Sequence, residues 1–259
     1  MQIQTGSAWR RDLAEWSIPK RILDQAPENP WIYPPAYFQV DDVITDSVSH
    51  QKAREAVPAG GSILDIGCGG GVAALACVPP AAKAIGVDLQ PKMLAMFVDS
   101  VKLRGVECES FEGLWPAIAP KVSNADVVTA HHVVYNVQEI EDFLLAMNSH
   151  ARKRVVIEMP QQHPQSRFAP LWQHFWNLER PSVPTPTELM RVLIDLGIRA
   201  NLELWDGYMG RNVDREQEAY YSTIRLCLPQ ARNNEVRAQL EMLSASTSRP
   251  LATIWWDVA

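Results

Sequence analysis

The stretch SILDIGCGGGVAAL, residues 62–75, decides the fold. Its apolar run carries Asp65 near the end, and four glycines follow within residues 67–71, before small residues that favour a helix. A glycine-rich turn between a strand and a helix commonly binds a phosphate group. The first question is therefore whether this turn suits a phosphate or a different ligand.

The spacing of the glycines argues against a dinucleotide. The fingerprint G-x-G-x-x-G has its third glycine five positions after the first, where it allows close packing of helix on strand. Counted from Gly67, that position is Val72. The sequence also has no Tyr-x-x-x-Lys pair, since Tyr135 is followed four residues later by Glu139. A nicotinamide-dependent oxidoreductase is thus the weaker interpretation.

The observed spacing, D-x-G-x-G-x-G after an apolar strand, resembles the first motif of the class I S-adenosylmethionine-dependent methyltransferases. The resemblance covers roughly residues 50–257 and implies S-adenosylmethionine as cofactor, with S-adenosylhomocysteine as product. The methionine end of that cofactor carries an ammonium and a carboxylate, and no phosphate. Glycines let the backbone approach such a ligand closely, and a carboxylate can meet the ammonium directly or through water. The cofactor-binding residues expected here are Asp65, Gly67, Cys68, Gly69 and Gly71.

Apolar strands alternate with helices along the rest of the chain. The seven predicted strands are residues 62–67, 82–88, 106–111, 125–130, 154–159, 198–205 and 250–258. Such alternation predicts an α/β fold, a Rossmann-like, doubly wound sheet with helices on both faces and its ligand at the carboxyl ends of the strands. The resemblance implies that the last strand runs antiparallel to the others.

The two ends of the chain differ in composition, which suggests a division into parts. Residues 1–50 combine aromatic residues with five prolines and are predicted to be an arm that packs on the main domain, residues 51–259. Helical insertions are expected at about residues 160–184 and 214–243. The aromatic residues of the first insertion, Trp172, Phe175 and Trp176, fit either a cover over the active site or ordinary helical core.

Several polar residues stand at positions typical of helix starts. Ser7 precedes a helix that would bury Trp9, Leu13 and Trp16 on one face. Asn136 with Glu139, and Thr185 with Glu188, have capping-box spacing. We therefore expect helices to begin at these three places.

The resemblance assigns further residues to the adenosine part of the cofactor. Asp88 ends the second predicted strand, where an acid accepts both ribose hydroxyls, and an ordinary helix-capping role is the alternative. Leu89 would flank the adenine. The segment after the third strand would flank it too, and the candidates there are Glu112, Leu114 and Trp115. For Trp115, core packing is an equal alternative.

The catalytic candidates lie in AHHVVYNV, residues 130–137, after the fourth strand. Alternation along a strand sends His131 and His132 to opposite sides, so only one is expected in the site. His131 would lie against the cofactor, whereas His132 and Tyr135 would face the acceptor. A base is needed only if the acceptor must lose a proton, and His132 is then the first choice. Structural histidines are the alternative, and an oxygen, nitrogen, sulfur or carbon acceptor stays open.

Composition narrows the partners. The 259 residues carry a formal charge of −6, and residues 130–137 lack the Asn-Pro-Pro-Tyr motif of nucleic-acid amino-methylating enzymes, so no nucleic-acid partner is expected. The four cysteines show no metal-binding spacing, so no metal is expected. No apolar run suggests a membrane segment, so a cytoplasmic protein is predicted. A small-molecule methyl acceptor is the expected partner, and no feature indicates a homo-oligomer. A non-catalytic S-adenosylmethionine-binding protein with a protein partner remains an alternative.

Overall fold

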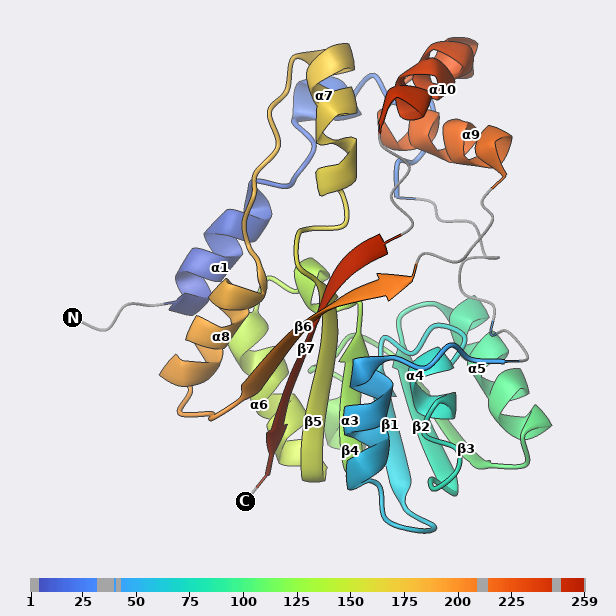
Figure 1. Ribbon diagram of the computed structural model, residues 1–259, viewed down its shortest axis with the longest axis vertical. Helices are drawn as coiled ribbons and strands as arrows, with labels where there is room; N and C mark the ends of the chain where they lie inside the picture. Colours follow the sequence, from blue (N-terminus) through green and yellow to red (C-terminus); the bar gives the residue numbers. More distant parts are fainter. Residues whose placement is uncertain (1–4, 32–39, 41–42, 209–213, 244–247, 259) are drawn as a thin grey trace.

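Figure 1 shows the computed structural model, which describes residues 5–31, 40, 43–208, 214–243 and 248–258. Within these residues one sheet contains seven strands. They are β1 (Ser62–Ile66), β2 (Lys83–Asp88), β3 (Glu107–Glu112), β4 (Ala125–His131), β5 (Ala151–Pro160), β6 (Asn201–Tyr208) and β7 (Ser248–Asp257). Their order is β3-β2-β1-β4-β5-β7-β6, and β7 runs antiparallel to both β5 and β6. The predicted α/β fold with an antiparallel last strand is confirmed.

The strand order reverses beside β1. Ile63 of β1 pairs with Ala84 of β2 on one side and with Val127 of β4 on the other, both in parallel. The chain therefore builds β1, β2 and β3 outward and then crosses back to β4. The carboxyl end of β1 lies at this switch point, which is where open α/β sheets bind ligands.

One face of the sheet is covered by α3 (Val48–Ala56), α4 (Val72–Leu75) and α5 (Pro91–Leu103). Phe97 of α5 is fully buried, and a Cβ atom on Gly86 of β2 would lie 2.7 Å from its ring, so this helix packs directly on the strand. Helix α4 is shorter than the predicted helical stretch. The prolines at positions 79 and 80 lack the N–H groups that would continue it.

The other face carries α1 (Thr5–Ala14), α6 (Ile140–His150) and α8 (Pro186–Asp195). Trp9, Leu13 and Trp16 are all buried, as their helical spacing predicted. Indole N–H groups hold this part of the arm in place: Trp9 Nε1 donates to the Val137 carbonyl at 2.8 Å and Trp16 Nε1 to the Val183 carbonyl at 2.6 Å.

Of the three predicted helix starts, one has the expected cap. Thr185 and Glu188 form a complete capping box at the start of α8. Asn136 does not cap α6; it ends a 3-10 helix, and α6 begins at Ile140 without a side-chain cap. Ser7 lies inside α1, which begins at Thr5. Ser7 lies in the first turn of α1 and Asn136 in a 3-10 helix, and spacing alone could not distinguish either position from a cap.

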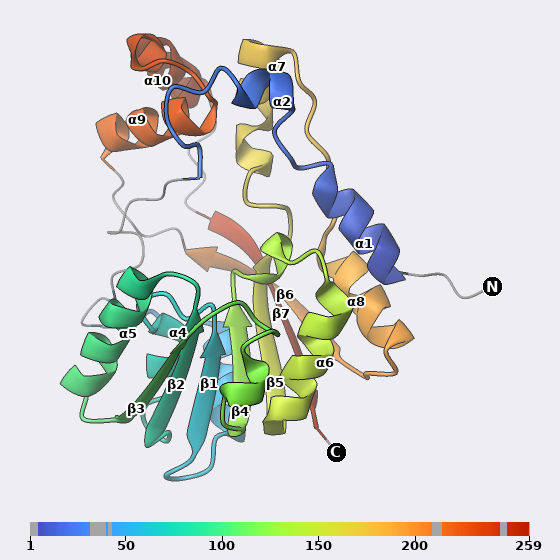
Figure 2. The same ribbon diagram turned by 180° about the vertical axis from the view of Figure 1, so that it is seen from behind.

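A layer of short helices lies over the carboxyl ends of the strands (Figures 1 and 2). It consists of α2 (Lys20–Leu23), α7 (Ala169–Trp176), α9 (Arg215–Arg225), α10 (Asn233–Met242) and the 3-10 helices η4 (Ser166–Phe168) and η5 (Gln230–Arg232). These segments share a separate hydrophobic cluster that includes Ile22, Trp172 and Val236. We call this layer the cap. Both predicted insertions contribute to it, and the predicted boundary at residue 50 falls inside α3.

Candidate functional site

The glycine loop, residues 67–71, leaves β1 at the switch point in a conformation that suits glycine. Gly67, Gly69 and Gly71 have φ angles of 70°, 51° and 98°, a region that costs other residues energy. The peptide N–H groups of Gly67 and Cys68 both donate to the Val87 carbonyl, at 2.8 and 3.1 Å. The loop is thus tied to the end of β2.

The loop also lies against the segment that follows β4. A Cβ atom on Gly67 would lie 2.5 Å from Cγ2 of Val133, closer than real Cβ atoms come to a neighbour. A Cβ atom on Gly71 would lie 2.9 Å from the ring of Phe97. Glycine at these two positions is required by close packing as well as by φ, and the packing brings the ends of β1 and β4 together.

Asp65 lies beneath the loop with 2% of its surface exposed. One of its carboxyl oxygens accepts a 3.3 Å hydrogen bond from the Ala74 amide. Burial raises the pKa of Asp65 to about 7, since that single amide only partly offsets the loss of water. A cation placed beside this carboxylate would favour its ionised form.

Asp88 joins the loop to the second strand. Its Oδ2 accepts from the Gly69 amide at 3.0 Å, and its Oδ1 accepts from the Gln90 amide at 2.9 Å. Asp88 does not cap α5, because Gln90 is the N-cap of that helix and no side chain caps it. Each carboxylate oxygen keeps a second lone pair, so Asp88 can still accept from ligand hydroxyls.

The residues predicted beside an adenine separate into two groups. Leu89 and Leu114 are 58% and 59% exposed, and Glu112 at the end of β3 is exposed and pairs in register with Asp88. Trp115 is only 4% exposed, and its indole N–H donates to the Phe143 carbonyl of α6. For Trp115 the structure matches the alternative, core packing. The Cys68 side chain is also buried, and burial raises the pKa of its thiol.

The two histidines after β4 depart from the alternation rule. His131 is the last residue of the strand, and His132 has a φ of 60°, in the left-handed region. This turn brings His132 Nε2 to 3.0 Å from Oε1 of Glu158 on β5, the residue that pairs in register with His131. Strand alternation does not apply to His132, because the strand ends before it, and both histidines lie beside Glu158.

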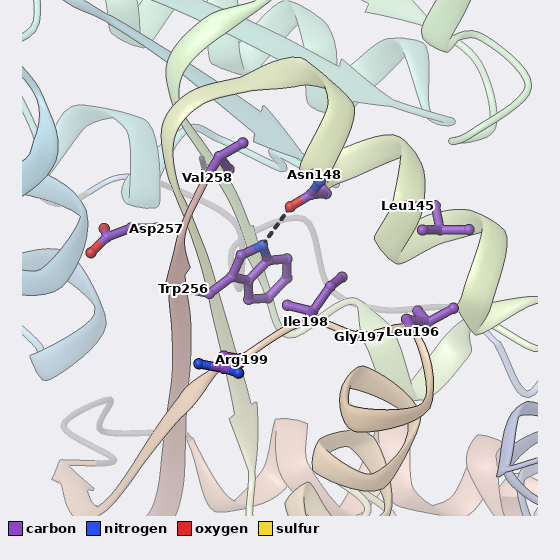
Figure 3. Close-up of a pocket in the computed structure, with 9 residues that line it drawn as sticks. All are labelled: Leu145, Asn148, Leu196, Gly197, Ile198, Arg199, Trp256, Asp257 and Val258. Atoms are coloured by element: carbon purple, nitrogen blue, oxygen red, sulfur yellow. Dashed lines mark hydrogen bonds between the residues drawn. The ribbon is translucent and has the colours of Figure 1, made fainter.

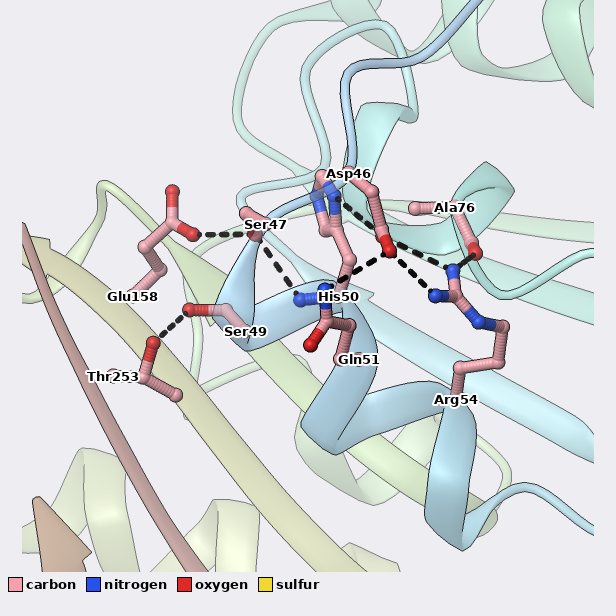
Figure 4. A network of polar contacts seen from close by, with 9 residues as sticks. All are labelled: Asp46, Ser47, Ser49, His50, Gln51, Arg54, Ala76, Glu158 and Thr253. Carbon is pink, nitrogen blue, oxygen red and sulfur yellow. Dashed lines mark hydrogen bonds and ion pairs between the residues drawn. The ribbon is translucent and has the colours of Figure 1, made fainter. Parts of the chain in front are cut away.

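Glu158 belongs to a buried polar row that crosses three strands. His131, Glu158 and Thr253 pair in register on β4, β5 and β7. The first turn of α3 covers them: the Ser47 hydroxyl donates to Glu158 Oε2 at 2.9 Å, and the Ser49 hydroxyl lies 2.6 Å from that of Thr253 (Figure 4).

His50 of α3 completes the group. Its ring stacks on His131 with centroids 5.3 Å apart. Burial lowers the pKa of His50 and lowers that of His131 to about 3, so both rings stay neutral. Burial alone would raise the pKa of Glu158, but its interactions with His131 and with the hydrogen-bonded His132 favour the ionised carboxylate and bring the pKa below its usual range. We call His50, His131, His132 and Glu158 the histidine cluster.

Buried polar atoms without a protein partner gather in this cluster. They are His50 Nδ1, His131 Nε2, His132 Nδ1 and the hydroxyl of Thr129. Buried polar atoms are normally hydrogen-bonded, so such a concentration is typical of a place that receives water or a ligand.

Tyr135 lies on the cap side of the histidine cluster, in η3 (Val134–Asn136). Its ring meets the edge of His163, which stacks on Trp16 with centroids 3.9 Å apart. Burial lowers the pKa of His163 to about 4, and the nearby Arg180 adds to the effect. The arm, the end of β4 and the first insertion thus meet in one aromatic group.

Comparison with known proteins identifies the family. The profile of a family described as a methyltransferase domain matches residues 42–201, well over half of the chain. This chain belongs to the methyltransferase family. The matched range contains the glycine loop, Asp88 and the whole histidine cluster, and the class I resemblance is thereby confirmed.

Relatives of the methyltransferase match only part of it. It is 35% identical to the ribosomal protein L11 methyltransferase of Citrobacter koseri over 82 residues. This aligned stretch is 31% of this chain and 28% of the relative. Over 128 residues it is 29% identical to the enzyme of the same name from Escherichia coli, covering 48% and 43%. The chain therefore spans less than half the length of these curated relatives.

Solved structures agree in fold. The YcgJ protein of Bacillus subtilis superimposes with a TM-score of 0.55 at 15% identity, over 81% of this chain and 97% of that one. A cyclopropane-fatty-acyl-phospholipid synthase-like protein from Lactobacillus casei gives a TM-score of 0.55 at 15% identity, over 80% and 87%. At these identities the likeness supports the architecture alone.

Sequence reasoning missed three residues of the methyltransferase site: Ser47, His50 and Glu158. One signal was readable, because Glu158 is the only charged residue in the otherwise apolar run VVIEMP, and buried acids are rare without a partner. Ser47 and His50, at the start of α3, had no comparable signal in the sequence. Ser47 lies 111 residues from Glu158 along the chain.

A hollow of about 380 Å³ lies at the opposite edge of the sheet, between α6, residues 196–199 and the end of β7 (Figure 3). Trp256 stands in it, with its Nε1 donating to Asn148 Oδ1 at 2.8 Å. Asp257 pairs with Arg154 near the start of β5, so the hollow is remote from the glycine loop.

Two further properties concern the described part of the methyltransferase. No helix there is long and apolar enough to cross a membrane. Nor do the described histidines, cysteines and acids form a group of three or more suited to a metal ion, the histidine cluster included.

Proposed function

We propose that this methyltransferase transfers a methyl group from S-adenosylmethionine to a small-molecule acceptor. One observation carries the proposal: a loop with three left-handed glycines lies at the switch point and is tied by the Gly69 amide to Asp88. This arrangement offers a close backbone surface and a carboxylate for a nucleoside, without a helix start that suits a pyrophosphate. The four-residue length of α4 agrees with that.

The residues present fit this cofactor. Gly67 has a positive φ and packs against Val133, so this part of the loop presents backbone rather than a side chain. Asp65 is a buried carboxyl group whose pKa of about 7 would fall beside an ammonium. Asp88 would hold the ribose hydroxyls, and the exposed Leu89 and Leu114 would flank the adenine.

S-adenosylmethionine supplies an activated methyl group on a sulfonium, so the protein needs mainly to position the acceptor and exclude water. The glycine loop and the two aspartates hold one partner. The cap lies over the carboxyl ends of the strands, and the aromatic group of Trp16, Tyr135 and His163 lies where the arm, the end of β4 and the first insertion meet.

A small-molecule acceptor is favoured over a protein substrate. The named relatives act on a ribosomal protein, but their likeness covers at most 128 residues and less than half of their length. The cap, which would contact the acceptor, is built largely from segments after residue 160 and from the arm. A buried, aromatic surrounding suits a small apolar molecule better than a basic protein segment.

Calorimetric titration of the full chain with S-adenosylhomocysteine and with NAD tests the cofactor. We expect only the first to bind. Asp88→Ala should weaken that binding roughly a hundredfold, since two hydrogen bonds to a charged group are each worth about 1.5 kcal/mol. Asp99→Ala, at an exposed position of α5, is the matched control and should bind as the wild type does. Binding of NAD alone would refute the proposal.

Product formation tests catalysis separately. Release of S-adenosylhomocysteine is measured with a panel of phenols, amines, thiols and carboxylic acids, and with ribosomal protein L11 as the protein alternative. Turnover with a small molecule supports the proposal. Turnover with the ribosomal protein alone would overturn the acceptor assignment, and binding without any turnover would favour a non-catalytic cofactor-binding protein.

A further inference from the structure

The pairing of His132 with Glu158 has the geometry of a catalytic base and its orienting acid. Glu158 is 6% exposed and ionised, and its Oε1 lies 3.0 Å from His132 Nε2. A carboxylate accepts a hydrogen bond from the ring nitrogen it faces, so Nε2 carries the hydrogen in the neutral ring. The lone pair then lies on Nδ1, a buried atom with no protein partner.

Both partners are held in place. The His132 amide donates to the Glu158 carbonyl at 2.8 Å, which fixes the backbone of the two residues together. The second oxygen of Glu158 accepts from the Ser47 hydroxyl, and Ser47 is itself the N-cap of α3. The left-handed φ of His132 is uncommon for a non-glycine residue, and such strain concentrates at functional sites.

The charges around the pair leave Glu158 as the group that can stabilise a protonated His132. His131 on β4 and His50 on α3 are neutral because burial lowers the pKa of each. Asp46, before α3, faces His50 at 3.9 Å and is neutralised by Arg54, whose guanidinium lies 2.7 Å away (Figure 4). No other charged partner of His132 occurs among the residues that the structure describes.

The pair lies next to the place proposed for the methyl donor. Val133 follows His132 directly and packs against Gly67 of the glycine loop. Tyr135, two residues further on, contacts the ring of His163. The segment that carries His132 therefore runs from the cofactor loop to the aromatic group of Trp16, Tyr135 and His163.

From this placement we infer that Glu158 is a positioning residue for His132, and that the pair removes a proton from a phenolic hydroxyl of the acceptor. The inference rests on the proposed function and names its substrate class. A neutral amine or a thiolate would need no base, so a built base indicates an acceptor that must lose a proton. A phenol loses its proton near pH 10, within reach of an imidazole, whereas water-like hydroxyls require about 15.7.

The step balances without a further reactant. The phenolic oxygen forms a bond to the methyl carbon as the bond between that carbon and sulfur breaks. Sulfur keeps the electron pair and becomes a neutral thioether, and the phenolic proton passes to His132 Nδ1. The negative Glu158 stabilises the resulting imidazolium, which later loses its proton to solvent.

Glu158→Gln, which keeps the shape but removes the charge, tests the inference in the full chain. With phenols as acceptors we expect kcat/KM to fall about a hundredfold, the scale of general base catalysis. The loss should appear in kcat rather than in KM, since Glu158 acts through His132 and not through contact with the acceptor. Matched anilines should be poorer acceptors than phenols for the wild type and should not show this loss of kcat.

Ser49→Ala is the matched structural control. It also removes a buried hydrogen bond of α3, at 2.6 Å to Thr253, but leaves His132 and Glu158 untouched. Its kcat with phenols should stay close to that of the wild type. Glu158→Gln acting like Ser49→Ala, or a preference for anilines, would overturn the inference while leaving the proposed function intact. Failure to bind S-adenosylhomocysteine, by contrast, would refute the proposed function itself.

Discussion

The glycine loop and the histidine cluster lie at the ends of adjacent strands, β1 and β4, but they are built in opposite ways. The loop consists of backbone: its amides donate to Val87 and Asp88, and its shape depends on three positive φ angles. The cluster consists of side chains from three elements, and several of its polar atoms have no protein partner. A site for an invariant ligand can be made from backbone, whereas proton transfer needs side chains in a particular charge state.

The largest effect is expected where the backbone construction is broken. Gly67→Ala should lower the free energy of unfolding by about 2–5 kcal/mol and abolish measurable S-adenosylhomocysteine binding, because strain from φ adds to a clash with Val133. Gly60→Ala is a close control, since Gly60 has nearly the same φ, 71°, but nothing within 4 Å of its added Cβ atom.

Only the strain of about 1–2 kcal/mol should remain in Gly60→Ala, with normal binding. Chemical denaturation and calorimetry measure the two quantities. If the two alanine variants behaved alike, close packing of the loop on the segment after β4 would not matter, and the contrast between loop and cluster would lose its basis.

Asp65→Asn sharpens the comparison. Asp65 is a buried ionisable side chain that lies beneath the glycine loop. Its pKa is raised to about 7 by burial, so the native state holds a proton that the unfolded state releases above about pH 4. Stability is therefore lost as the pH rises from about 4 to 7. At pH 8 the asparagine variant should be more stable by on the order of a few kcal/mol.

The same variant should bind S-adenosylhomocysteine less tightly, because the amide cannot pair with the ammonium. Wild-type affinity should rise between pH 6 and 8 as Asp65 ionises, and the variant should lack this rise. Asp99→Asn is the control and should change neither property. Loss of stability in Asp65→Asn at pH 8 would show that the carboxyl group is not the strained element inferred here.

The histidine cluster should have the opposite dependence on pH. The pKa of His131 is about 3 in the folded protein, whereas an unfolded histidine titrates near 6.5. Unfolded chains therefore bind an extra proton as the pH falls, and stability is lost from about 6.5 downward. One such histidine accounts for about 2 kcal/mol between pH 7 and 5.

His131→Gln should reduce the loss of stability on acidification by that amount in thermal or urea unfolding. His163→Gln is a positive control, since burial lowers the pKa of His163 to about 4 and the same reasoning applies. An unaltered pH dependence in His131→Gln would mean that the ring is protonated in the native cluster, contrary to the description of His131 as neutral.

The same contrast explains what could be predicted from the sequence. Glycine spacing, the strands and the Thr185 cap depend on neighbours within a few residues, so their patterns were readable. The contact of Ser47 with Glu158 joins residues far apart in the chain, and no local pattern encodes it. The positive φ of His132 was also unreadable, because the left-handed region is uncommon for any non-glycine residue and depends on the surrounding fold. The glycine loop and the strands were therefore predictable, and the contact of Glu158 with His132 was not.

The smallest effect concerns the arm, which resembles the loop in having its polar groups paired. Trp9 is 1% exposed, and its indole N–H donates to the Val137 carbonyl, so Trp9→Phe should cost about 1 kcal/mol for one lost hydrogen bond. Trp31→Phe, at a position 55% exposed, should cost much less. Because Trp9 packs on the α6 face, away from α3, neither variant should alter S-adenosylhomocysteine affinity, as calorimetry can verify. A large loss of affinity in Trp9→Phe alone would mean that this part of the arm acts on the cofactor site, and that satisfied contacts remote from the loop control binding as strongly as the loop does.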